Sequence, residues 1–200
     1  PLLGGRPCHE FVDQVAVAPY FGSSIGASKH DYEDRIKKTG KYIVSEYNSL
    51  FDGRPISEWV KDPDGGSGAL FRELELYELP KIREWMQYSL NVANKYGVNL
   101  GAYDGGQHGV ATNNDIRPGV MAMFESANND SRMGVMYTQY MNNWKSVGGE
   151  TLTLFNSIGK GGPSGYWGML PHMMNDSAPK WDSAKAFRDN IPCWWTHCHA

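Results

Sequence analysis

Three short apolar segments, each next to a glycine-rich turn, constrain the fold of this chain more than any other feature. They cover 12–19, 98–103 and 151–155, and the second and third each follow a predicted helix that ends at glycine. Apolar strands that alternate with helices are typical of a parallel sheet with helices packed outside it. The order therefore predicts an α/β protein, either an open doubly wound sheet or part of a (β/α)8 barrel.

The long connection between the first two strands predicts a helix and then a surface segment. Ser28 and Asp31 have the spacing of a capping box, which predicts a helix over 29–50. Segment 51–68 contains Asp-Gly, Asp-Pro and Asp-Gly-Gly-Ser-Gly, all of which favour turns. We interpret it as an excursion over the surface rather than a linker between domains.

Three more helices are predicted from their caps and their apolar spacing. One begins near Pro80 and ends at Gly97, because proline fits a first turn and glycine fits the position after a last one. Another is capped by Asp130 or Ser131, and a final helix covers 179–189. The helix after Asp130 has the clearest helical period in the chain, which is carried by Met133, Met136, Tyr137, Tyr140, Met141 and Trp144.

The chain is rich in aromatic residues and glycine, with 7 Trp, 11 Tyr, 7 Phe and 23 Gly against 20% charged residues. This composition is frequent in proteins that handle sugars, because flat rings stack on the apolar faces of pyranoses. For any single ring, core packing is the simpler interpretation. Trp85 and Trp144 lie on apolar helix faces, so we predict both to be core residues.

Charge and hydropathy exclude several kinds of partner. The 19 basic and 22 acidic side chains give a net charge of -3, so no basic surface for nucleic acid is predicted. Apolar runs of about 18 residues, which a membrane span needs, do not occur, so no membrane partner is predicted. The opening residues, PLLGGRPCHEF, have no signal-peptide pattern, and the oligomeric state stays open.

The cysteines and the glycine run 159–165 indicate no metal or cofactor. Cys193 and Cys198 are spaced for a disulfide or for plain packing of the tail, and the second ligand pair that zinc needs is not evident. The glycine run lacks the Lys-Ser/Thr pair of a phosphate-binding loop. We therefore predict neither a metal site nor a cofactor.

Polar and aromatic residues follow the predicted strands where each one ends. Tyr20 follows the first strand, Asp104, Gln107 and His108 follow the second, and Trp167 lies a short loop after the third. Because the carboxyl ends of parallel strands meet on one rim, these side chains are expected to converge there. A carboxylate beside an aromatic floor suits glycoside chemistry.

The same stretches resemble a known family. VAVAPYFG, then AYDGGQH, then Gly-Gly-x-Thr-Leu-x-Leu-Phe-x-Ser followed by Tyr-Trp-Gly, are similar to the last three strands of a glycoside-hydrolase-like (β/α)8 barrel of the clan A type. The version with these motifs is found in large bacterial proteins, some of them described as cellulose-binding. The resemblance covers about 11–187. It implies that 1–200 is the C-terminal portion of one such TIM barrel domain, about strands six to eight with outer helices and without the N-terminal strands.

The resemblance also implies roles for the rim residues. Asp104 stands where the family has a glutamate nucleophile, Tyr20 where a tyrosine hydrogen-bonds that nucleophile, and Trp167 where a tryptophan forms the sugar floor. The clan's acid/base glutamate would lie upstream of Pro1. The implied function is a retaining glycoside hydrolase that acts on a β-linked poly- or oligosaccharide, in a secreted or periplasmic protein.

Asp104 leaves other interpretations open. Aspartate withdraws the carboxylate by one methylene, roughly 1.5 Å, while retaining enzymes hold their two carboxyl groups about 5–5.5 Å apart. Asp104 is then a slow nucleophile, a base in an inverting arrangement, or part of a non-catalytic carbohydrate-binding protein. An aspartate that only stabilises a turn is the plainest alternative, and Gln107 and His108 either contact the sugar or support the loop.

Overall fold

Two parallel strands form the sheet that the sequence predicts. Strand β3 (Gln14–Val17) pairs with β4 (Asn99–Ala102) in the register that places Val15 opposite Leu100. The third apolar segment adds a single parallel bridge, between Leu152 and Ala102. The three segments therefore lie side by side, and the prediction of parallel strands is confirmed for the first two.

The computed structural model describes most of the chain, and its remaining elements are helices and one hairpin. An antiparallel pair at the N-terminus, β1 and β2, is followed by a single turn of 3-10 helix, η1. The described residues are 2–26, 47–111, 117–196 and 198. Apart from β3 and β4 the elements are β1 (Leu2–Leu3), β2 (Arg6–Pro7), η1 (Cys8–Phe11), α1 (Ser23–Gly26), α3 (Ile56–Trp59), α4 (Ser67–Glu73), η2 (Leu74–Glu78), α5 (Leu79–Lys95), α6 (Arg117–Asn129), α7 (Ser131–Val147) and α8 (Pro179–Asn190).

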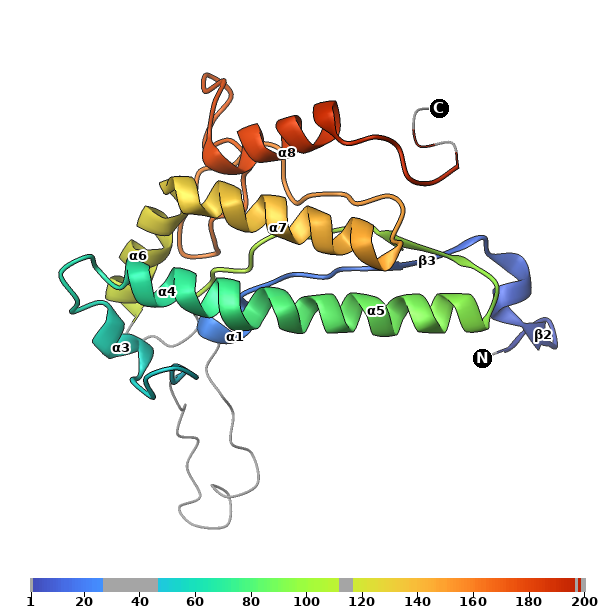
Figure 1. Ribbon diagram of the computed structural model, residues 1–200, viewed down its shortest axis with the longest axis horizontal. Coiled ribbons are helices and arrows are strands. Elements are labelled where there is room, and N and C mark those ends of the chain that lie inside the picture. Colours follow the sequence, from blue (N-terminus) through green and yellow to red (C-terminus); the bar gives the residue numbers. More distant parts are fainter. Residues whose placement is uncertain (1, 27–46, 112–116, 197, 199–200) are drawn as a thin grey trace, which may run out of the picture.

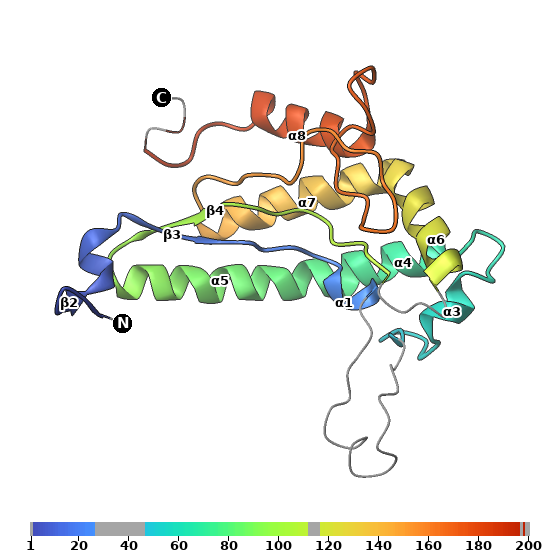
Figure 2. The same ribbon diagram turned by 180° about the vertical axis from the view of Figure 1, so that it is seen from behind.

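Helices α5, α7 and α8 lie roughly side by side, and α7 packs against both others (Figure 1). Seen from behind, the strand pair runs along α5 and α7 (Figure 2). Val15 and Val17 of β3, together with Leu100 and Ala102 of β4, pack toward the helices and join the core. Side chains on the opposite face of the strands are exposed in the part of the chain that the structure describes, namely Gln14, Ala16 and Asn99. The sheet is therefore covered on one face.

The cap signals place α7 and the end of α5 correctly. Gly97, with a φ of 65°, follows the end of α5. Pro80 lies in the first turn of α5, but α5 continues directly from α4 through η2, so the helical run begins at Ser67 rather than near Pro80. The Asp130 carboxylate accepts a hydrogen bond from the Arg132 backbone N–H at 2.8 Å, so Asp130 is the N-cap of α7. Gly148, with a φ of 88°, ends the same helix.

Of the two tryptophans predicted to be core residues, one is buried and the other is exposed. Trp144 on α7 is 0% exposed, and its indole donates to the Glu150 carbonyl at 2.9 Å, so that prediction is confirmed. Trp85 on α5 is 61% exposed, so that prediction is wrong. The buried stripe of α5 runs through Leu79, Ile82, Met86 and Ala93. Because residue 85 lies at the border of that stripe, its ring projects beyond the covered face.

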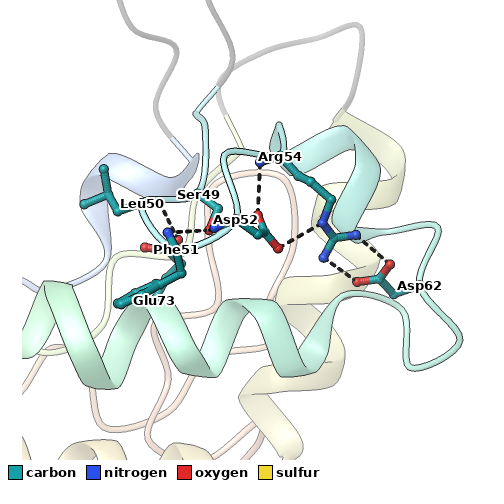
Figure 3. A network of polar contacts seen from close by, with 7 residues as sticks. All are labelled: Ser49, Leu50, Phe51, Asp52, Arg54, Asp62 and Glu73. Atoms are coloured by element: carbon teal, nitrogen blue, oxygen red, sulfur yellow. Dashed lines mark hydrogen bonds and ion pairs between the residues drawn. The ribbon is translucent and has the colours of Figure 1, made fainter.

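The predicted helix over 29–50 lies mostly outside the described residues, and its last four positions, 47–50, are not helical. The segment predicted as a surface excursion, 51–68, is partly core, because α3 buries Ile56 and Trp59 completely. Its polar part is organised around an arginine (Figure 3).

Arg54 holds this turn together. Its guanidinium donates to both oxygens of Asp62, at 2.8 and 3.0 Å, and to Asp52 at 2.9 Å (Figure 3). Its own backbone N–H also donates to Asp52, and these bonds hold the pKa of the Asp52 carboxyl below its usual range. The buried Glu73 carboxylate accepts from the Leu50 N–H at 2.8 Å, which fastens the turn to α4.

The C-terminal tail is anchored by a disulfide and a tryptophan. Cys193 and Cys198 form the disulfide that their spacing allows. Inside that short ring, the Trp194 indole donates to the Gly149 carbonyl at 2.8 Å, and its ring lies edge-on to Phe187 of α8. The tail therefore covers the start of the third apolar segment. No helix in the described ranges is long and apolar enough to cross a membrane.

Candidate functional site

Four of the five predicted site residues meet where the strands end. The Tyr20 ring lies edge-on to both His108 and Trp167, with ring centroids 5.6 Å apart in each pair. His108 and Trp167 are 4.7 Å apart, again edge-on. Asp104 joins this group through Tyr20. The structure thus gathers side chains from three loops into one aromatic-walled site.

The strand pairing resumes beyond β3 and β4 and brings these loops together. Phe21 forms a parallel bridge with Gln107. The Phe21 N–H donates to the Gly106 carbonyl at 3.0 Å, and the His108 N–H donates to the Phe21 carbonyl at 2.8 Å. Because Tyr20 precedes Phe21, these backbone bonds place its ring beside the loop that carries Asp104 and His108.

The Tyr20 phenol lies within electrostatic reach of the Asp104 carboxylate. Burial raises the pKa of Tyr20 well above its usual value, and the nearby Asp104 carboxylate raises it further. Tyr20 is therefore neutral over the physiological range, and its hydroxyl is a hydrogen-bond donor close to a carboxylate that only accepts.

Gly105 and Gly106 let the loop that carries Asp104 pack closely against α7. A Cβ at Gly105 would lie 2.3 Å from the Tyr140 hydroxyl oxygen, and one at Gly106 would lie 2.7 Å from that of Tyr137. Gly106 also has a φ of 133°, which favours glycine. The two glycines are thus required by close packing on two buried tyrosines.

Both ends of the Gln107 side-chain amide form hydrogen bonds within the protein. Its side-chain amide donates to the Tyr166 carbonyl at 2.7 Å, and its oxygen accepts from the Gly109 N–H at 2.6 Å. Its backbone N–H donates to the Tyr137 hydroxyl at 3.1 Å. The Gln107 side chain therefore links the Asp104 loop to the loop that carries Trp167.

His108 is half-buried, and burial lowers the pKa of its imidazole below the usual 6.5. The ring is therefore largely neutral at pH 7, where one nitrogen donates and the other accepts. Nδ1 is enclosed and has no hydrogen-bond partner among the residues that the structure describes. A neutral imidazole can bond to a hydroxyl group without adding charge.

Trp167 is half-buried and fixed in orientation. Its indole donates to the Ser164 carbonyl at 2.7 Å, and Phe155 contacts the ring edge-on at 5.8 Å. Phe155, which is 40% exposed, is an aromatic residue of this site that the sequence did not single out. Its signal was its place as the last residue of the third apolar segment, directly before the rim.

Two buried charged residues that support the rim were also missed. The Glu78 carboxylate accepts hydrogen bonds from the Gly22 N–H, at 2.9 Å, and from the Ser24 hydroxyl, which fastens the loop after Tyr20 to the helix. Lys180, at the start of α8, donates to the Tyr166 carbonyl at 2.8 Å. No sequence motif marks either residue, because their role depends on contacts between distant segments.

A hollow of about 200 Å³ lies beside Tyr20, between the end of β3 and α5, and the exposed Trp85 forms part of its wall. Within the described ranges, no group of three or more His, Cys, Asp or Glu residues is arranged to hold a metal ion. No family model, no curated protein and no solved structure matches this chain. The function is therefore argued from the geometry and from the sequence resemblance.

Proposed function

We propose that this chain is part of a carbohydrate-active protein resembling a retaining glycoside hydrolase, with Asp104 at the nucleophile position and Trp167 as the sugar platform. The observation that carries the proposal is the cluster in which Tyr20, His108 and Trp167 meet edge-on, with the Asp104 carboxylate close enough to raise the pKa of the Tyr20 phenol. A carboxylate beside a neutral phenol and an indole suits an oxocarbenium-like sugar.

The partial (β/α)8 barrel is the fold that we propose for this function. Parallel sheets are usually covered on both faces. Here the helices cover one face, while Gln14, Ala16 and Asn99 on the other are exposed. In a closed barrel that second face would line the packed interior, and the site would lie at its carboxyl-terminal rim. The position of Asp104 and Tyr20 just beyond the strand ends supports this arrangement.

The side chains divide the proposed work as follows. Trp167 stacks on the apolar face of a pyranose, and His108 bonds to a sugar hydroxyl. Asp104 attacks or stabilises the anomeric carbon while Tyr20 holds its carboxylate in place. The resemblance puts the general acid in a segment upstream of Pro1, so residues 1–200 by themselves are expected to bind sugar without cleaving it.

A non-catalytic carbohydrate-binding protein is the second candidate. The aspartate in place of the family's glutamate favours it, because a reacting atom misplaced by about 1 Å can cost two orders of magnitude in rate. The aromatic wall serves binding equally well in either case. The two candidates differ in turnover and share the same sugar site.

Titration calorimetry with cello-, xylo- and manno-oligosaccharides tests the sugar site. We expect one series to bind, Trp167→Ala to abolish its binding, and the control variant Tyr88→Ala, an exposed aromatic ring on α5, to bind as the wild type does. Loss of binding in both variants, or in neither, contradicts the assignment of Trp167. If no saccharide binds, the proposed function is wrong.

A reducing-sugar assay on a longer protein that includes the upstream segment separates the two candidates. Glycoside hydrolysis that disappears in Asp104→Asn, while saccharide binding persists, supports the enzyme. Unchanged turnover in Asp104→Asn rejects Asp104 as the nucleophile. Binding without any turnover supports the non-catalytic protein.

A further inference from the structure

Lys180 is a buried lysine that holds the loop of the proposed sugar platform. It is 1% exposed, and its Nζ donates to the carbonyl oxygens of Tyr166, at 2.8 Å, and Trp167, at 3.3 Å. In the part of the chain that the structure describes, no carboxylate forms an ion pair with it. Its Nζ therefore donates to two backbone carbonyls rather than to a carboxylate.

The Tyr166 carbonyl also accepts a hydrogen bond from the Gln107 amide, at 2.7 Å. One oxygen atom is thus held from two sides, by α8 through Lys180 and by the Asp104 loop through Gln107. This carbonyl belongs to the peptide bond that joins Tyr166 to Trp167. Holding it therefore fixes the backbone from which the Trp167 side chain extends. The ring itself lies against Tyr20 and His108.

We propose that Lys180 is a positioning residue for the sugar site, which sets the Trp167 ring against Tyr20 and His108 by holding the Tyr166–Trp167 backbone. The identity of the ligand rests on the proposed function, whereas the hold on Trp167 does not. Lys180 contacts no sugar in this arrangement, and its effect on binding passes entirely through the indole.

The protonation of Lys180 supports this role and makes it measurable. Burial lowers the pKa of Lys180 to about 7. The titratable groups around it are Tyr137 of α7, whose ring centroid lies 6.0 Å from Nζ, Tyr166 in the loop, and Glu125 of α6, which acts on Tyr166. Burial keeps both tyrosines neutral, so Lys180 is the group that changes charge near pH 7. Charged donors make the stronger hydrogen bonds, so the hold on Trp167 weakens as pH rises.

A weaker hold on Trp167 at higher pH predicts that saccharide affinity falls as pH rises. A lysine that only stabilises the fold would not give this fall. A lysine whose pKa is lowered by folding makes the folded chain more stable as pH rises through its folded pKa, because the unfolded chain binds the proton more tightly. If Lys180 only supported the fold, saccharide affinity would be constant or would increase with pH. If Lys180 positions Trp167, affinity decreases while stability increases.

The experiment follows Trp167 directly by fluorine NMR of protein labelled with 5-fluorotryptophan, with the Trp167 resonance identified by its absence in Trp167→Phe. We expect this resonance, without any ligand, to shift with a midpoint at about pH 7. The shift should vanish in Lys180→Met, and in Lys180→Arg the resonance should stay at its low-pH position because arginine remains charged. Lys185→Met, an exposed lysine on the same helix, should behave like the wild type.

The titration of His108, whose ring also contacts Trp167, is separated by its pH range. Its pKa is lowered below 6.5, so any shift that it causes falls at lower pH and persists in Lys180→Met. Calorimetry with cellohexaose gives the second readout. We expect wild-type affinity to fall about 3- to 10-fold from about pH 6.5 to about pH 8.5, and Lys180→Arg to show no such fall.

A Trp167 resonance that is indifferent both to pH near 7 and to either Lys180 variant overturns the inference, as does a saccharide affinity that rises with pH. Lys180→Arg keeps the test valid if the methionine variant does not fold. If cellohexaose and the other saccharides do not bind at any pH while the resonance still follows Lys180, the proposed function fails and the positioning role stands.

Discussion

The Asp104 carboxylate raises the pKa of the Tyr20 phenol, and the two residues follow different strands of one parallel pair. The pairing of β3 with β4 brings the two side chains close together. The pKa of Tyr20 therefore reports on whether the strands hold the proposed site together.

Asp104→Asn should lower the pKa of Tyr20. The carboxylate raises that pKa, so removing its charge moves the pKa back toward the usual value of about 10, while the contribution of burial remains. The difference in tyrosinate absorbance between each protein and its Tyr20→Phe counterpart isolates this phenol. An unchanged Tyr20 titration in Asp104→Asn would show that the two side chains do not interact in solution.

Gly105→Ala should destabilise the protein by about 1–3 kcal/mol, because the new Cβ meets the Tyr140 hydroxyl oxygen at 2.3 Å. Tyr140→Phe removes that oxygen, so the double variant should lose less stability than the sum of the two single variants. Urea unfolding of the four proteins measures the coupling. Strict additivity would contradict the close packing that we describe.

Trp144→Ala and Trp85→Ala should have very different effects on stability. Trp144 is 0% exposed and its indole is hydrogen-bonded, so its removal should cost about 3–5 kcal/mol. Trp85 is 61% exposed, and its loss should stay within about 0.5 kcal/mol. Equal losses in chemical unfolding would mean that Trp85 is covered in solution.

The stability of the protein should rise with pH above about pH 7, the value to which burial lowers the pKa of Lys180. Between this value and the usual lysine pKa of about 10.4, the unfolded chain binds the proton more tightly, so the slope approaches about 1.4 kcal/mol per pH unit. Lys180→Met should remove this part of the slope. Parallel pH profiles for the wild type and Lys180→Met would rule out Lys180 as its source.

The sequence predicted the parts of the fold that are encoded locally. Apolar runs and caps placed β3, β4, α7 and the end of α5, because strand burial and helix ends depend on a few neighbouring residues. The third apolar segment forms only one bridge, and the exposure of Trp85 depends on which elements pack beside α5. Both are set by tertiary neighbours that no local pattern reveals.

The same distinction holds for the site. Because the carboxyl ends of parallel strands meet on one rim, the sequence predicted that Tyr20, Asp104, His108 and Trp167 lie close together, and they do. It did not reveal that the Gln107 side-chain amide donates to the Tyr166 carbonyl, because that carbonyl belongs to a loop distant in sequence. Lys180 gave no signal for the same reason, since a lysine in the first turn of a helix is ordinarily exposed.

The two glycines that follow Asp104 lie against the hydroxyl groups of Tyr137 and Tyr140. Both tyrosines belong to α7, a helix that packs against α5 and α8. The position of the loop that carries Asp104 therefore depends on the packing of α7 as well as on the loop's own residues. Substitutions that shift α7 against either neighbouring helix are expected to move this loop without changing any residue in it.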